Sequence, residues 1–182
     1  NLPGVVLVTT GPGSTNAITG VVGAWLDSIP MIIISGQVKQ ITTINSHPSL
    51  SLRQLGDQEI NIIDIVKPIT KYANTVENPN HIKFHLEKAV HLATTGRPGP
   101  VWLDIPIDIQ SSKINIDSLK SYLPENNNMK KNIDLDFHIK TFFELLRKSE
   151  RPVIVAGHGI HLSNSNKIFL ELIKSYKFQL FP

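Results

Sequence analysis

The chain has 182 residues, 41% of them hydrophobic and 18% charged, with a formal net charge of +3, so it is long enough for one large domain or one and a half. Its lysines are spread out without interleaved aromatic residues, which argues against nucleic-acid binding, and its apolar runs are too short to span a membrane. The lack of cysteine excludes disulfides, thiolate metal ligands and a cysteine nucleophile, and it favours a cytoplasmic location.

The first elements predicted are a strand, a glycine-rich turn, a helix and a second strand. Residues 5–9 form an apolar, β-branched run that is typical of a strand buried on both faces. A Gly-Pro-Gly turn follows at 11–13, and the side-chain oxygens at 14–16 are expected to cap a helix that begins at Ala17. A buried strand is predicted over 31–36. This order indicates a right-handed parallel crossover, which places the turn at the carboxyl edge of a sheet.

The next part of the chain predicts further alternation of helices and strands. We expect a long surface loop, a short helix, a short strand, a longer helix and a buried strand, over residues 39–55, 57–66, 71–76, 81–94 and 101–105. The longer helix should turn one apolar face inward, comprising Ile82, Leu86, Ala89, Val90 and Ala93. The pattern predicts an α/β fold with a parallel sheet.

A change of composition after the last of these strands predicts a second unit. Residues 111–132 are rich in Ser, Lys and Asn and have the composition of a linker. Beyond them we expect a helix over 134–149, a strand over 151–156 and a helix that begins after Ser165. The predicted organisation is therefore a domain over 1–110, a linker over 111–132, and the start of a second α/β domain over 133–182.

Several short motifs follow one another along the first domain. They are GPGSTN at 11–16, AWLDSIP at 24–30, GQV at 36–38, QE at 58–59, KPITK at 67–71, TGRPGPV at 95–101 and DIP at 104–106. A bare Gly-Pro-Gly turn is weak support for any function, but the whole string is specific. It resembles the pyrimidine-binding domain of thiamine diphosphate enzymes, and most closely the acetolactate synthase (acetohydroxyacid synthase) group. The resemblance is dense over residues 1–110 and looser beyond them.

The resemblance implies a Rossmann-like, three-layer pyrimidine-binding domain followed by the beginning of a central α/β domain. It implies a carboligase or decarboxylase, classed as a lyase or transferase, that acts on 2-keto acids with thiamine diphosphate. Mg²⁺ would be bound by a domain absent from this sequence, FAD is kept in some members, and a homodimer or homotetramer is expected. The family's catalytic glutamate would lie before Asn1. We therefore assign no catalytic residue and no metal ligand here, and we expect the chain to be part of a longer protein and inactive alone.

The family's cofactor-binding positions can be transferred to this sequence one residue at a time. Pro12 and Asn16 match positions that line the aminopyrimidine ring, and Gly13 matches one that lets the ring approach the main chain. Gln37 matches a glutamine near the cofactor. The alternative roles are a helix cap for Asn16 and, for Gln37, an amide that hydrogen-bonds nearby backbone.

Two further positions concern the substrate and FAD. Gln58 matches a residue that reaches the substrate channel from a neighbouring subunit. The residue before it is Asp57, where the synthases usually carry phenylalanine, so the resemblance leaves acetolactate specificity open. Arg97 matches an arginine that contacts FAD in the FAD-binding members. Its alternative role is a surface arginine that binds Asp104 or a backbone carbonyl.

Alternative functions and sites remain at this stage. If the chain is not part of an enzyme, two alternatives are open. It is a non-catalytic nucleotide- or phosphate-binding module, or it is a structural remnant. Phosphate-binding loops usually carry more glycines or a following Lys-Ser/Thr, which this turn lacks. His81 and His85 lie one helical turn apart, but no third ligand has suitable spacing, so an exposed helix face is the simpler interpretation. A stripe of small residues, Ala17, Gly20 and Ala24, is a candidate contact between subunits.

Overall fold

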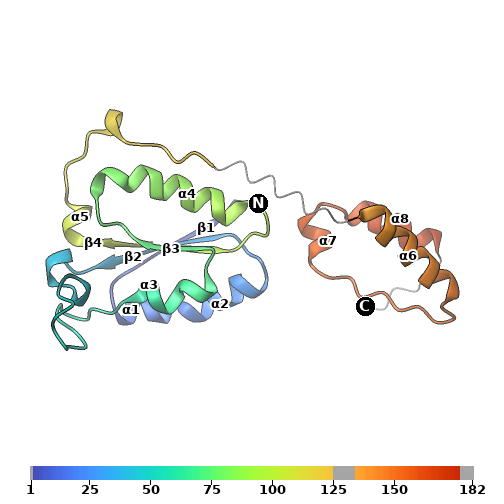
Figure 1. Ribbon diagram of the computed structural model, residues 1–182, viewed down its shortest axis with the longest axis horizontal. Coiled ribbons are helices and arrows are strands. Elements are labelled where there is room, and N and C mark those ends of the chain that lie inside the picture. The colour runs from blue at the N-terminus through green and yellow to red at the C-terminus, as the bar shows by residue number, and fades with distance from the viewer. Residues whose placement is uncertain (1, 125–133, 177–182) are drawn as a thin grey trace. The chain divides into compact units, whose positions relative to one another are not determined.

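A computed structural model describes residues 2–124 and 134–176 of the chain (Figure 1). The chain divides into two compact units, Asn1–Glu125 and Asn126–Pro182. Residues 125–132 of the predicted linker, and the predicted start of the second domain at residue 133, lie outside the described residues, as does the end of the chain from residue 177.

The first unit is a parallel sheet with helices on both faces. Its strands are β1 (Gly4–Val8), β2 (Met31–Gln37), β3 (Tyr72–Thr75) and β4 (Pro100–Pro106). Its α-helices are α1 (Pro12–Asn16), α2 (Ile18–Leu26), α3 (Ile62–Val66), α4 (Ile82–Thr94) and α5 (Ile107–Gln110). Single 3₁₀ turns occur at η1 (Gln40–Thr42), η2 (Ile44–Ser46), η3 (Lys67–Ile69), η4 (Pro79–His81) and η5 (Ile116–Ser118).

The four strands lie in the order β1-β2-β4-β3, and every pair is parallel. Helices α1, α2 and α3 cover one face of the sheet, and α4 covers the other (Figure 1). The predicted three-layer α/β fold is thus confirmed. Because all strands run in the same direction, the segments that follow β1, β2 and β4 meet at one edge of the sheet.

The core consists of two apolar clusters, one on each side of the sheet. On the side of α2 and α3, the fully buried Trp102 and Ile33 pack with Val21, Ile62 and Val66. On the side of α4, Val101 and Leu103 pack with Ile32, Ala89 and Ala93. Alternate residues of β2 and β4 thus point to opposite clusters, which is why these strands read as continuous apolar runs.

Three predictions about burial and helix capping are wrong. Strand β1 lies at the edge of the sheet and is not buried on both faces, since Val5 is 62% exposed and Leu7 76% exposed. The helix predicted from Ala17 is α2, which begins at Ile18, but no side chain caps it, because residues 14–16 belong to the separate short helix α1. On α4, Leu86 and Val90 are exposed at 38% and 47%, because Ala89 and Ala93 are the residues of the predicted face that pack into the core cluster with Val101 and Leu103.

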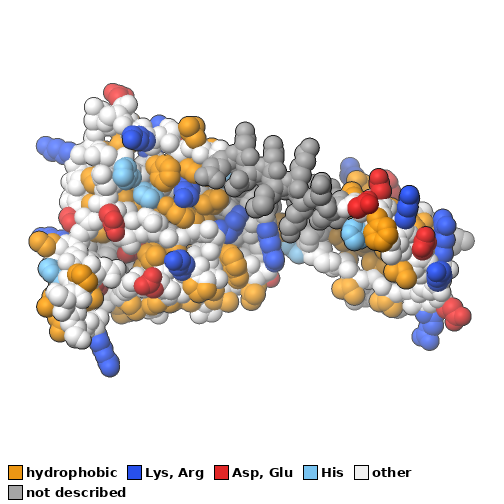
Figure 2. Space-filling view, in the orientation of Figure 1, with side chains coloured by type: hydrophobic (Ala, Val, Ile, Leu, Met, Phe, Trp, Pro, Cys, Tyr) orange, Lys and Arg blue, Asp and Glu red, His pale blue; other side chains and the backbone are white. Residues whose placement is uncertain are grey.

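The predicted stripe of small residues on α2 does not form one exposed surface. Ala24 is 3% exposed and faces the core, whereas a Cβ at Gly20 would meet no atom of the chain within 4 Å. Figure 2 shows hydrophobic side chains exposed on the side of the first unit that carries α2 and α3. Trp25 and Leu26 of α2 and Ile65 of α3 are exposed. The chain's own packing therefore does not explain why α2 carries Gly20.

Within residues 134–176, the second unit contains three helices, α6 (Leu135–Lys148), α7 (Gly159–Leu162) and α8 (Asn166–Ser175). The Asp134 carboxylate caps α6 by accepting a hydrogen bond from the Phe137 amide at 3.0 Å. The strand predicted over 151–156 does not form, and Val153 and Val155 are about nine-tenths exposed. Within 2–124 and 134–176, no helix combines the length and the apolar character that crossing a membrane requires.

Candidate functional site

The candidate site lies at the carboxyl edge of the sheet, where β1, β2 and β4 end next to one another. The Gly11 turn follows β1, Gln37 closes β2, and Asp104 lies near the end of β4. The register pairs Ser35 with Asp104 and Gln37 with Pro106. Residues that are far apart in the sequence therefore meet at this edge, as expected for a parallel sheet.

The turn after β1 is built around Gly11, which is buried and has φ = +57°. A Cβ at this position would lie 2.1 Å from the carbonyl oxygen of Gln58, so only glycine fits. Gln58 itself has φ = +55°, a conformation that costs a non-glycine residue about 1 kcal/mol or more. The turn and the loop that carries Gln58 are therefore in direct backbone contact. Two of the predicted site segments are brought together in this way.

The other predicted residues of the turn differ in their surroundings. A Cβ at Gly13 would lie 2.5 Å from Thr9 Cγ2, so contact within the chain already accounts for this glycine. Ser14 Oγ donates to the Thr9 carbonyl at 2.6 Å. Pro12 and Asn16 are exposed on α1, and Asn16 makes no side-chain hydrogen bond to any residue of the described ranges. The proposed cap role of Asn16 is not observed, since α1 has already begun four residues earlier.

Gln37 is 8% exposed, and each of its polar atoms has two partners. Its Nε2 donates to the Ile60 carbonyl at 3.0 Å and to Asp104 Oδ2 at 3.1 Å. Its Oε1 accepts from Thr10 Oγ1 at 2.8 Å and from the Val38 amide at 3.0 Å. This side chain thus joins the turn after β1, strands β2 and β4, and the segment before α3. Its hydrogen-bonding capacity is used within the chain, as the alternative role for Gln37 predicts.

Asp104 is the buried charged group of this edge, with 3% of its surface exposed. Ser35 Oγ donates to Asp104 Oδ1 at 2.5 Å, and the Trp102 indole N–H donates to Ser35 Oγ at 2.8 Å. Burial raises the pKa of Asp104 to about 6, although the hydrogen bonds from Ser35 and Gln37 oppose the increase. A chain of hydrogen bonds therefore runs from the core at Trp102 through a titratable carboxyl to Gln37.

A polar cavity of about 110 Å³ opens beside Asp104 and Gln37. Glu59, Thr75 and Glu77 also line it. The Glu59 carboxylate accepts three backbone hydrogen bonds, from Ile44, Leu55 and Gly56. Sequence reasoning did not single out Ser35, Asp104 or Glu59 for this role. The available signal was a polar residue within each of two otherwise apolar strand sequences, at Ser35 and at Asp104.

Arg97 lies at the opposite edge of the sheet, because it precedes β4. Its Nε donates to Ser28 Oγ at 2.7 Å and its Nη2 to the Leu26 carbonyl at 3.5 Å, so it binds a carbonyl and not Asp104. A cavity of about 300 Å³ beside it is lined by Trp25, Leu26, Lys71, Arg97 and Pro98. Burial lowers the pKa of Lys71, whose Nζ donates to the Thr95 carbonyl at 2.6 Å. The structure therefore separates Arg97 from the other predicted site residues.

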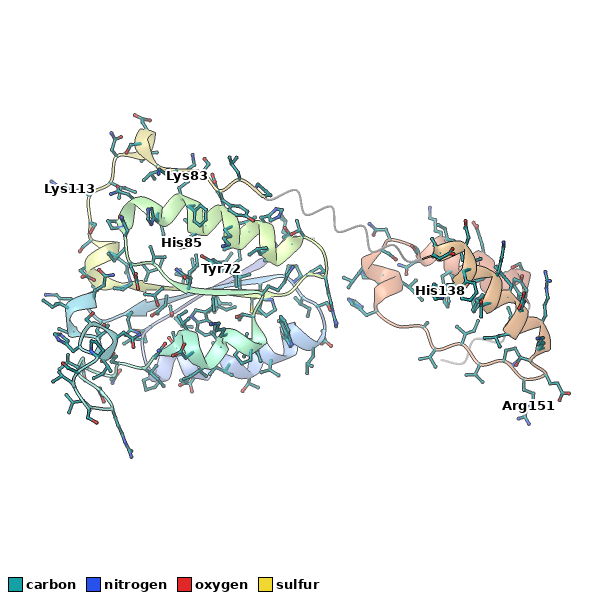
Figure 3. The ribbon with its side chains drawn as sticks, in the orientation of Figure 1. Tyr72, Lys83, His85, Lys113, His138 and Arg151 are labelled. Carbon is teal, nitrogen blue, oxygen red and sulfur yellow. The ribbon has the colours of Figure 1, made fainter. Side chains whose placement is uncertain are left out.

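His81, which ends η4, and His85, which lies on α4, belong to an aromatic cluster. The Tyr72 hydroxyl lies 2.6 Å from His85 Nδ1, and the two side chains face each other between β3 and α4 (Figure 3). Burial lowers the pKa of His85 and raises that of Tyr72 to about 12. Among the residues that the structure describes, no three His, Cys, Asp or Glu side chains are grouped so that they could hold a metal ion.

Comparison with known proteins supports the resemblance seen in the motifs. Residues 1–65 match the family described as "Thiamine pyrophosphate enzyme, N-terminal TPP binding domain". The acetolactate synthase large subunit of Lactococcus lactis is 38% identical over 177 residues, covering 96% of this chain and 28% of the relative.

Two further acetolactate synthase subunits align over a similar range. The large subunit of Buchnera aphidicola from Acyrthosiphon pisum is 42% identical over 178 residues, covering 93% of this chain and 29% of the relative. The isozyme 3 large subunit of Escherichia coli is 34% identical over 179 residues, covering 94% and 29%. The chain spans a little under a third of the length of these relatives. The matches support a thiamine diphosphate-dependent, acetolactate synthase-like chain.

Proposed function

We propose that the chain supplies the pyrimidine-binding part of a thiamine diphosphate-dependent carboligase or decarboxylase that acts on 2-keto acids. The observation that carries this proposal is the backbone contact between Gly11 and Gln58 at the carboxyl edge of the sheet. Gln58 is exposed, as are Pro12, which directly follows Gly11, and Asn16 at the end of α1. A flat, largely apolar ring with polar edges suits such a surface.

The residues at this edge fit the cofactor's pyrimidine ring in different ways. Pro12 offers an apolar surface and Asn16 offers an amide, and both are exposed on α1. Gln37 acts indirectly in this proposal, because its amide already holds Thr10, Ile60 and Asp104 in place. When bound, the cofactor supplies the nucleophile that adds to the 2-keto carbonyl and accepts the electrons left by departing carbon dioxide. This chain then orients the ring and excludes water from it.

Gln58 is the residue that we propose for contact with the substrate. Its side chain is exposed and makes no hydrogen bond within 2–124 and 134–176, so its amide can donate to a carboxylate or a carbonyl oxygen. The neighbouring Asp57 is also exposed. In the synthases, a 2-keto acid acts as the second, acceptor substrate, and it is an anion with an apolar side chain. A carboxylate at Asp57 would disfavour such an acceptor, so we propose that the acceptor substrate of this protein is more polar.

For FAD, we propose that Arg97 is the contact, together with Lys71 and Trp25. Both cations and the indole line the same cavity of about 300 Å³, which suits an anionic ligand that carries a flat ring. We propose that Mg²⁺ is held by a domain outside this sequence, that the enzyme is a homodimer or homotetramer, and that it works in the cytoplasm. The cysteine-free composition fits the last point.

The alternative phosphate-binding module is disfavoured by the hydrogen bonds of the turn. The Gly13 amide donates to the Thr10 carbonyl at 3.2 Å, and the Thr15 amide donates to the Gly11 carbonyl at 3.0 Å. A phosphate-binding loop instead directs successive backbone amides toward the ligand. Helix α1 has only five residues, so its dipole adds little.

The proposal can be tested by nuclear magnetic resonance with the ¹⁵N-labelled chain. Thiamine diphosphate with Mg²⁺ is added in steps, and ADP with Mg²⁺ serves as the matched anionic control. We expect saturable shifts at the Gly11 amide and at the Gln58 side-chain amide with thiamine diphosphate only. Equal shifts with both compounds would favour the phosphate-binding alternative, and no shift at this edge with either compound would refute the proposal.

A further inference from the structure

We propose that Glu59 is the positioning residue of this site, because it closes the loop 39–58 and thereby holds Gln58 against Gly11. The inference rests on the proposed function, since it concerns how Gln58 is presented to a ligand. The contacts of Glu59 join two parts of the loop that are distant along the chain, one at Ile44 and the other at Leu55 and Gly56.

The Glu59 carboxylate accepts hydrogen bonds from three backbone amides. Oε1 accepts from Ile44 at 2.6 Å, and Oε2 accepts from Leu55 and from Gly56, each at 3.1 Å. The Glu59 amide in turn donates to the Gly56 carbonyl at 3.2 Å. Hydrogen bonds to an ionised acceptor are roughly twice as strong as those between neutral groups. The side chain therefore fastens both the beginning and the end of the loop to one point.

The loop also packs tightly against its own starting segment. Gly56 is buried, and a Cβ there would lie 2.6 Å from Val38 Cγ2 and 2.9 Å from the Thr42 carbonyl oxygen. This contact and the carboxylate bonds act on neighbouring residues, Leu55 and Gly56. Gln58 follows Gly56 by two residues, so these contacts leave its backbone little freedom to relax.

Gln58 is held in a conformation that it would not adopt by itself. Its φ of +55° is unfavourable for a residue with a Cβ. Its carbonyl oxygen lies 2.1 Å from the position that a Cβ of Gly11 would take. Such a conformation persists only where the surroundings determine it. The fixed points on either side are Gly56 and Glu59, both held by the carboxylate. Removal of this charge should let Gln58 relax to negative φ and leave Gly11.

The first test compares Glu59→Gln with Asp57→Asn by nuclear magnetic resonance. Asp57 is the matched control because it is an exposed acid in the same loop that accepts no hydrogen bond within the described residues. In Glu59→Gln we expect loss of the nuclear Overhauser contact between Gly11 and Gln58 and about tenfold faster amide exchange at the three bonded residues. Asp57→Asn should change neither. A Gly11–Gln58 contact that survives in Glu59→Gln would overturn the inference.

A second measurement covers the case in which Glu59→Gln fails to fold. Loss of slow amide exchange at Ile33 and Leu103 in the core would reveal that failure. In the wild-type chain, the amides of Ile44, Leu55 and Gly56 should then exchange through one shared opening, with the same rate and the same dependence on denaturant. Independent opening of the Ile44 amide and the Gly56 amide would contradict a common fastening point.

A ligand titration separates positioning from a purely structural role. With thiamine diphosphate and Mg²⁺, the Gln58 side-chain signal should respond about tenfold more weakly in Glu59→Gln than in the wild type. Asp117→Asn, which removes an exposed acid of η5 that has no assigned role at the site, should match the wild type. An unchanged Gln58 response in Glu59→Gln would leave Glu59 a structural role only and overturn the inference. A wild-type chain that shows no response refutes the proposed function instead, and the Gly11–Gln58 contact then decides the inference by itself.

Discussion

The protonation of Asp104 should make the stability of the first unit depend on pH. Burial raises the pKa of this carboxyl from 3.8 to about 6 in the folded chain. Each pKa unit corresponds to about 1.4 kcal/mol, so the difference amounts to roughly 3 kcal/mol. Because the folded state binds the proton more tightly than the unfolded state, this contribution is fully present below about pH 4. It is lost as the pH rises through about 6.

Replacement of Asp104 by Asn isolates the effect. Ser35 Oγ can still donate to the Asn oxygen, whereas the Asn amide would face Gln37 Nε2, another donor. That mismatch lowers stability by an amount that does not depend on pH. Glu59 and Glu77, which line the same cavity, are unchanged in both proteins. The difference in unfolding free energy between the two proteins should therefore shift in favour of Asp104→Asn by roughly 3 kcal/mol between pH 4 and pH 7.5.

Urea unfolding measured by tryptophan fluorescence is the suitable assay. Trp102 is fully buried and belongs to the same hydrogen-bond chain, so it reports on the first unit. Asp57→Asn is the control, because it removes an exposed carboxyl that accepts no hydrogen bond within the described residues. A difference between wild type and Asp104→Asn that stays constant across the pH range would refute the reasoning, since it would mean that Asp104 is ionised in the folded chain at pH 4.

Three further outcomes follow from the structure. Gly11→Ala should destabilise the chain by more than about 2 kcal/mol, because its Cβ would collide with Gln58. Gly20→Ala should instead stabilise α2 by about 0.5–1 kcal/mol. Urea unfolding of the two variants measures both effects, and equal changes in unfolding free energy would contradict this reasoning. Trp102→Phe should cost about 1 kcal/mol beyond its change in packing, since Ser35 loses a donor, and Ser35→Ala in the same background should then add less than it does alone. The chain alone, given pyruvate, thiamine diphosphate and Mg²⁺, should form no acetolactate above the no-protein blank, and sustained turnover would contradict this.

The sheet could be predicted from the sequence because β2 and β4 are buried on both faces. Continuous apolar runs such as 31–34 and 101–103 are typical of that environment, and the Gly-Pro-Gly turn marks the end of β1. The exposure of β1 could not be predicted in the same way. Its run of Val and Leu has the same pattern in a central strand and at an edge, and only the strand order distinguishes the two.

The contacts of the site were less accessible than its residues. The motifs named Gly11 and Gln58, but not that their backbones touch, because 46 intervening residues must fold before the two meet. The charge on Glu59 gave no sign of its three backbone partners, since Ile44, Leu55 and Gly56 share no motif with it. Such contacts are long-range, and local periodicity carries no information about them.

The position of Arg97 before β4 sets a minimum length for anything that would reach both ends of the sheet. Strand β4 runs for seven residues between Arg97 and the edge that carries the Gly11 turn. At about 3.3 Å per residue, this separates the two by roughly 20 Å. A compact ring held at the turn cannot touch Arg97, so the two places would be filled by different molecules or by opposite ends of a long one. Losing a ligand from one of them would then leave the affinity of the other unchanged, unless the strands themselves move.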